Sequence, residues 1–67
     1  MKIKANETFM KVRIKKGYSL TGLAEKMGVS ASVVFNIESQ KNVRPATARK
    51  ACTALNEAFE TLFTIEE

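Results

Sequence analysis

The sequence predicts an all-α fold of five short helices, and three features of the pattern support this expectation. Apolar residues recur three and four positions apart, as they do along one face of a helix, and no window alternates convincingly between apolar and polar residues. Gly17, Gly28, the segment 40–45 and Asn56 divide the chain into pieces of helix length. A chain of 67 residues has the size of one small domain, so we expect residues 1–67 to form a single domain.

The first helix is expected over residues 7–16. Asn6 precedes it and can accept a hydrogen bond from one of the free N–H groups at its start. Phe9 and Val12 share the face that we expect to be buried, whereas Ile14 falls on another face and is expected to be partly exposed.

The second and third helices are expected over residues 20–27 and 31–38, with Ser19 and Ser30 as their N-terminal caps. Gly28 ends the second helix, because glycine is the residue that adopts the left-handed conformation at least cost. The apolar stripe of the second helix consists of Leu20, Leu23, Ala24 and Met27.

The third helix has two faces of different character. Val34 and Ile37 point in one direction and predict the buried side. Ser32 and Asn36 point almost opposite, with Phe35 beside them. The phenyl ring of Phe35 could contact thymine methyl groups, or it could fold back onto the second helix.

Together these two helices have the spacing of a helix-turn-helix unit over about residues 19–38. Ala24 stands where the two helices should cross closely, Gly28 supplies the turn, and Val29 follows it into the core. One face of the third helix then stays free and can enter the major groove of DNA. Two alternatives remain at this point: an ordinary helical hairpin in a small bundle, or the same fold without DNA binding.

A fourth helix is expected over residues 45–55, because proline fits the first turn of a helix. Its Cys52 is the only cysteine, so no disulfide forms within the chain, and we expect a small buried residue rather than a metal ligand. We expect no metal and no cofactor. The inward set of this helix consists of Ala48, Ala51, Cys52 and Leu55.

The two ends of the chain give weaker signals. A fifth helix is expected over residues 57–63. A short strand over residues 2–4 is only weakly indicated. Lys2 and Lys4 could form a basic arm, although a frayed terminus is the simpler expectation.

Charge is distributed unevenly along the chain. Residues 1–50 contain all 11 Lys and Arg residues and three of the seven acidic residues, whereas residues 51–67 contain the other four acids and no base. A basic body with an acidic tail suits a polyanionic partner on one face, although a solvated basic surface has the same composition.

Composition also excludes several classes of function. The chain contains no His, no Asp and no glycine-rich phosphate loop, so we expect no enzymatic activity. No apolar run approaches the roughly 20 residues that span a bilayer, and the first residues lack the apolar region of a signal peptide. We therefore expect a cytoplasmic protein without membrane contact.

The run RIKKGYSLTGLAEKMGVSASVVFNIE, followed by NVRP and ALNEAFETLF, resembles the Cro and phage-repressor family of helix-turn-helix proteins, also called the xenobiotic-response-element type. The resemblance covers roughly residues 9–63. It implies five helices in a lambda-repressor-like arrangement, of which the second and third read DNA. It also implies a dimer on a two-fold symmetric operator.

The resemblance further implies roles for individual positions. Arg13 and Glu38 are expected to form an ion pair between the first and third helices. The base-reading positions are Ala31, Ser32 and Asn36, with Phe35 close by, and the positions that hold the DNA backbone are Ser19, Leu20, Lys41 and Arg44.

The chain departs from the family pattern at four positions. Leu20 stands where a glutamine usually braces a phosphate, so that only the backbone N–H groups at this helix start could do so. Ala31 stands where many members carry glutamine or arginine, and Phe35 is unusually large for the reading face. Gln40 replaces the usual glycine after the third helix. These changes leave the fold intact and the preferred DNA sequence open.

These observations predict a repressor-like, sequence-specific DNA-binding regulator that acts as a homodimer. With no residues left for an effector domain, control is expected through concentration, dimerisation or a second regulatory protein. The rival hypothesis is an antitoxin-like or adaptor protein that uses the same fold chiefly to bind protein, and a structured-RNA binder ranks below both. The apolar excess that suggests a dimer interface consists of Phe59, Leu62, Phe63 and Ile65.

Overall fold

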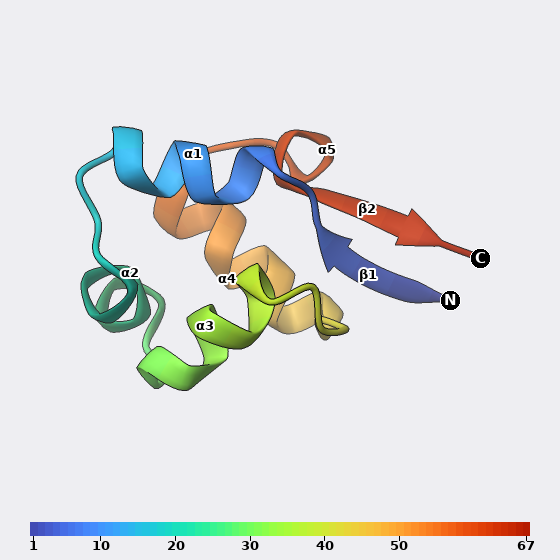
Figure 1. Ribbon diagram of the computed structural model, residues 1–67, viewed down its shortest axis with the longest axis horizontal. Helices are drawn as coiled ribbons and strands as arrows, with labels where there is room; N and C mark the ends of the chain where they lie inside the picture. The colour runs from blue at the N-terminus through green and yellow to red at the C-terminus, as the bar shows by residue number, and fades with distance from the viewer.

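Five helices surround one apolar core, and a two-stranded sheet joins the two ends of the chain in the computed structural model, which describes residues 1–67 (Figure 1). The helices lie close to their expected positions, apart from the last. The elements in chain order are β1 (Lys2–Ala5), α1 (Thr8–Lys15), α2 (Leu20–Met27), α3 (Ala31–Glu38), α4 (Pro45–Leu55), α5 (Phe59–Leu62) and β2 (Phe63–Glu66).

Side-chain caps fix the starts of α1 and α2. The backbone N–H of Thr8 donates to Asn6 Oδ1 at 2.9 Å, and that of Gly22 donates to Ser19 Oγ at 2.9 Å. Each bond satisfies an N–H that has no partner within its helix. At the other end of α2, Gly28 adopts a left-handed φ of 76°, as its expected role requires.

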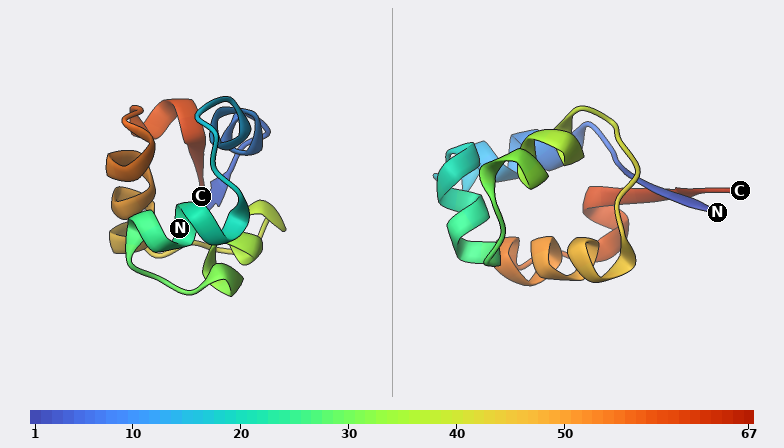
Figure 2. Two further views of the ribbon diagram at one scale, coloured as in Figure 1. Left: turned by 90° about the vertical axis from the view of Figure 1, so that its left-hand side faces the viewer. Right: turned by 90° about the horizontal axis from the view of Figure 1, so that it is seen from below.

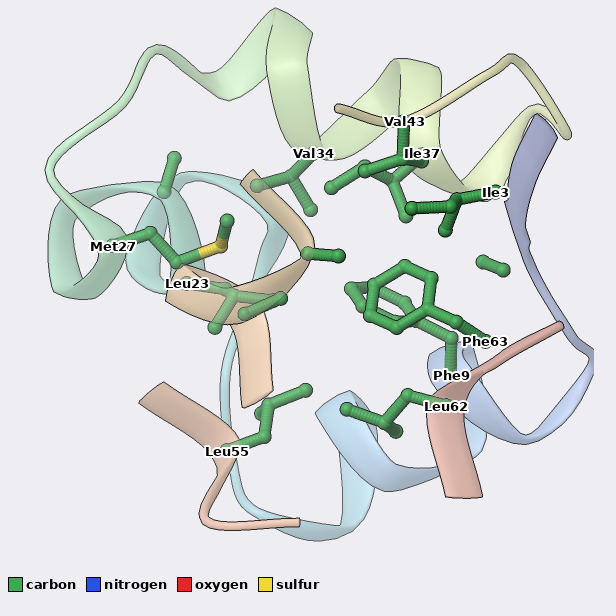
Figure 3. Close-up of a cluster of buried hydrophobic side chains, with 14 residues drawn as sticks. Ile3, Phe9, Leu23, Met27, Val34, Ile37, Val43, Leu55, Leu62 and Phe63 are labelled. Atoms are coloured by element: carbon green, nitrogen blue, oxygen red, sulfur yellow. The ribbon is translucent and has the colours of Figure 1, made fainter. Parts of the chain in front are cut away.

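The core is a single cluster to which every element contributes (Figure 3). Phe9 of α1 and Phe63 of β2 lie with ring centroids 5.6 Å apart, and Leu62 lies beside them. Leu23 of α2 and Val34 of α3 are fully buried where these two helices meet. The 14 core residues are Ile3, Ala5, Phe9, Leu23, Ala24, Met27, Val34, Ile37, Val43, Ala48, Ala51, Leu55, Leu62 and Phe63.

The sheet corrects the expectation of an all-α fold. β1 and β2 pair antiparallel, with Ile3 opposite Ile65 and Ala5 opposite Phe63, and the sheet extends away from the helices (Figures 1 and 2). The N-terminus is therefore a paired strand and neither a free basic arm nor a frayed end. Only four residues contribute to each strand, and the partners lie at opposite ends of the chain, so no local alternation could reveal the pairing.

The fifth helix is also shorter than expected. It ends at Leu62, and Phe63 adopts an extended φ of −133° that begins β2. Both Leu62 and Phe63 are almost completely buried within the protomer, so they are not available to a partner subunit as the predicted dimer interface requires. Of the four residues in that prediction, Phe59 is half-buried and Ile65 is exposed.

The different burial of Phe63 and Ile65 predicts different losses of stability when each is replaced by alanine. Phe63→Ala removes a buried ring and is expected to destabilise the protein by about 3–5 kcal/mol. Ile65→Ala, two residues away on the same strand, is expected to cost less than about 1 kcal/mol because the side chain is 49% exposed. Urea unfolding of dilute protein measures both values, and equal costs for the two variants would contradict the assigned burial.

Candidate nucleic-acid interface

A buried ion pair fixes the position of α3. Arg13 of α1 donates from Nε to Glu38 Oε2 and from Nη2 to Glu38 Oε1, and the distance from Nη2 to Oε1 is 3.1 Å. Its Nη1 donates to the carbonyl oxygen of Tyr18 at 2.8 Å. The side chains of Arg13 and Glu38 are only 11% and 13% exposed. The expected ion pair is therefore present, and its link to the loop before α2 is a contact that sequence reasoning missed.

The opposite faces of α3 have the character that the helical wheel predicts. Val34 and Ile37 are buried, Ser32 and Phe35 are exposed, and Asn36 is half-buried. Figure 2 shows α3 at the edge of the molecule, and the burial of Val34 and Ile37 on its inner side leaves Ser32 at the surface.

Ser30 was expected to cap α3, but its side chain does not do so. It occupies the N-terminal position of the helix with an extended backbone, but no hydrogen bond joins its side chain to the helix backbone. Its Oγ lies 2.9 Å from Ser32 Oγ instead. The first N–H groups of α3 therefore lack a protein cap at the same end of the helix as Ala31 and Ser32.

One flank of the exposed face joins the loop after α3. Asn36 lines a shallow hollow together with Asn42, Arg44 and Thr47. Sequence reasoning selected Asn36 and Arg44 but not the other two, because their approach depends on the path of the loop between α3 and α4. Two amides, a guanidinium and a hydroxyl line this hollow, so this flank can both donate and accept hydrogen bonds.

The loop itself makes a sharp turn. Gln40, where the family has glycine, adopts a left-handed φ of 67°. The N–H of Lys41 donates to the carbonyl oxygen of Asn36 at 3.2 Å, which holds the start of the loop against the end of α3. Lys41 and Arg44 are exposed and form no ion pair within the chain. Their charges are free to meet an external anion.

The start of α2 is the second place where the family pattern expects contact with the DNA backbone. Ser19 is exposed and Leu20 is half-buried against the core. Because Ser19 Oγ already accepts from Gly22, the groups left to hold an anion are the remaining N–H groups of the first turn. The start of α2, the loop after α3 and α3 itself thus carry every residue that the family pattern assigns to DNA contact.

A second surface lies where the sheet meets α4. Ile3, Pro45, Cys52, Phe59 and Ile65 line an apolar hollow there, with Met1 and Arg49 at its border. We call these residues the apolar patch. Partial burial raises the pKa of the Cys52 thiol, and the nearby carboxylate of Glu60 raises it further. The thiol is therefore expected to remain protonated and slow to react.

The chain belongs to the Helix-turn-helix family of the Cro and phage-repressor type, whose family model matches residues 9–62. No curated protein and no solved structure matches the chain significantly. The family is DNA-binding, regulatory and in general not enzymatic, so the protein is a DNA-binding transcription regulator of the helix-turn-helix class. None of its helices combines the length and the apolar character that crossing a membrane requires.

The buried ion pair can be tested by removing one of its charges and then both. Glu38→Ala leaves the Arg13 guanidinium buried without its counter-charge and is expected to cost about 3–5 kcal/mol of unfolding free energy. The double variant Arg13→Met with Glu38→Leu removes both charges and is expected to recover most of that loss. Urea unfolding measures the free energy of unfolding of the native protein, the single variant and the double variant. A single variant within 1 kcal/mol of the native protein would mean that the pair is solvated rather than buried.

Proposed function

We propose that the protein is a repressor-like regulator that binds a symmetric operator as a dimer, with α3 in the major groove of each half-site. The observation that carries this proposal is the exposed, partly polar face of α3, where Asn36 shares a hollow with Arg44 of the loop that follows the helix. Side chains on the outer face of α3 would meet base edges, and the loop after α3 and the start of α2 would hold the backbone strands that border the groove.

Asn36 and Ser32 supply the hydrogen bonds to bases. The Asn36 amide can donate to and accept from one adenine edge at once, and the Ser32 hydroxyl can do either. Ala31 and Phe35 lie on the same face and supply apolar contact. Lys41 and Arg44 of the loop, and the backbone of Ser19 and Leu20, hold phosphates.

The apolar patch is the surface that best fits a two-fold contact. It has an apolar centre, with Arg49 at its border and the acidic Glu60 near Cys52. In a two-fold arrangement each patch meets a second copy of itself, so that Arg49 of one protomer would approach Glu60 of the other. Two α3 helices about 34 Å apart would then fit successive major grooves on one side of the duplex.

A second candidate function has one observation in its favour. Met10 and Ile14 lie one helical turn apart on α1 and are 49% and 59% exposed. Met10 also borders a hollow that it shares with Glu38 and Gln40. An antitoxin-like or adaptor protein would use such a surface to bind another protein, and a second regulatory protein could act on the DNA-binding form there. That function predicts that Ile14→Glu abolishes the biological effect while DNA affinity is unchanged.

The division between base reading and phosphate holding is testable with two variants. Asn36→Ala is expected to cost about 1–3 kcal/mol on the preferred duplex and to relax preference at one base position. Lys41→Ala is expected to weaken all sequences about equally and to reduce the slope of log K against log salt by about 0.9. Fluorescence anisotropy with duplexes recovered from a random pool measures both effects over a salt series.

The contrast between the variants controls for misfolding, since a loss of folding lowers both affinities without altering selectivity. An Asn36→Ala protein with unchanged base preference would refute the assigned reading face. Affinity that stays flat between low and moderate salt would refute nucleic-acid binding altogether.

The proposed dimer surface has its own test. Ile65→Glu places a charge within the apolar patch and is expected to weaken dimerisation at least tenfold, or about 1.4 kcal/mol. Ile14→Glu on α1 is the matched control, with a side chain of similar exposure outside the patch, and is expected to leave the dimer unchanged. Sedimentation equilibrium measures both. A monomer at all concentrations, with only one copy bound per operator, would contradict the proposal.

A further inference from the structure

The exposed face of α3 is divided into a polar half and an apolar half. Ser32 and Asn36 form the polar half. Ala31 and Phe35 lie one helical turn apart, on the side of the helix nearer to Glu38, and both are exposed. Phe35 is the largest exposed apolar side chain of α3, with 57% of its surface accessible. We call Ala31 and Phe35 the apolar strip.

The phenyl ring has no structural role in the protomer. Phe35 belongs neither to the core nor to the partly buried residues packed against it, and it joins neither of the two aromatic pairs. The ring therefore does not fold back onto α2. Its backbone is well held, because the N–H and the Oγ of Ser39 both donate to the carbonyl oxygen of Phe35, each at 2.9 Å.

The apolar strip offers no hydrogen-bonding group to a base. In the major groove every base presents donors or acceptors, and the only apolar group is the methyl at C5 of thymine. A donor or acceptor pressed against a phenyl ring would lose its water without gaining a partner. A methyl group gains from the same contact because its apolar surface leaves water.

We propose that the apolar strip makes this regulator a reader of the 5-methyl group of a pyrimidine, whether the base is thymine or 5-methylcytosine. This inference rests on the proposed insertion of α3 into the major groove. 5-Methylcytosine carries its methyl group at the same ring position as thymine and differs in its exocyclic group, which the strip does not contact by hydrogen bonding. Methylation of cytosine at that position of the site would therefore strengthen binding.

The test uses the duplex recovered from a random pool and changes single methyl groups. Replacing thymine by uracil, one position at a time, is expected to weaken binding about fourfold at one position per half-site, the effect of about 0.8 kcal/mol for one buried methyl group. With a C·G pair at that position, 5-methylcytosine is expected to bind about fourfold more tightly than cytosine. Substitutions at other positions are expected to have little effect.

Phe35→Ala and Ser32→Ala separate the apolar strip from the rest of the face. Phe35→Ala is expected to unfold like the native protein, since the ring lies outside the core, and to bind the thymine and uracil duplexes equally. Ser32→Ala is expected to keep the fourfold difference. A Phe35→Ala protein that still distinguishes the two duplexes would overturn the assignment.

The outcomes also separate this inference from the function on which it rests. If the native protein selects a sequence but shows no sensitivity to any single methyl group, the methyl-reading role is wrong and sequence-specific binding stands. If no sequence is enriched from the pool and binding does not weaken with salt, both are overturned.

Discussion

The position of α3 depends on the guanidinium of Arg13. An eight-residue helix has little stability of its own, and α3 is anchored to the core chiefly by Val34 and Ile37. Two apolar contacts hold such a helix against the core without fixing its rotation. The ion pair with Glu38 and the bond to the Tyr18 carbonyl fix it, because charge-assisted hydrogen bonds are directional and this one has little access to solvent. The end of α1 and the loop that follows it thereby hold one orientation of α3, which lies 25 residues further along the chain.

That orientation determines which side chains are left outside. With Val34 turned inward and Glu38 held by α1, Asn36 of the polar half lines the hollow beside the loop after α3, and the apolar strip lies on the side of the helix nearer to Glu38. Leu23 of α2 and Val34 of α3 are fully buried between these two helices, so the opposite side of α3 stays outside the core. A surface that carries both hydrogen-bonding groups and a phenyl ring suits the edge of base pairs, where amides, carbonyls and methyl groups alternate.

Local signals made most of the fold predictable. The cap at Ser19, the glycine turn at Gly28 and the proline at the start of α4 each act within a few residues, and the helices they bound lie where expected. The ion pair came only from the family resemblance, since no local rule joins residues 13 and 38. The strand indicated over residues 2–4 is present as β1, but β2 and the pairing of the two strands were missed because they lie at opposite ends of the chain. That error also misplaced Phe63, whose apolar side chain was assigned to a dimer surface before the core that buries it could be seen. The left-handed turn at Gln40 was hidden for a different reason, because residues other than glycine rarely adopt it.

In the proposed complex, DNA meets α3, the start of α2 and the loop that follows α3. The most direct test is an NMR titration of the ¹⁵N-labelled protein with the duplex selected from a random pool, observing every backbone amide. We predict that the largest shifts fall at residues 19–21, 30–36 and 40–44, with smaller changes at the apolar patch if two copies meet on the operator. Shifts confined to α1 around Met10 and Ile14, with residues 30–36 unaffected, would contradict the account and favour the protein-binding alternative.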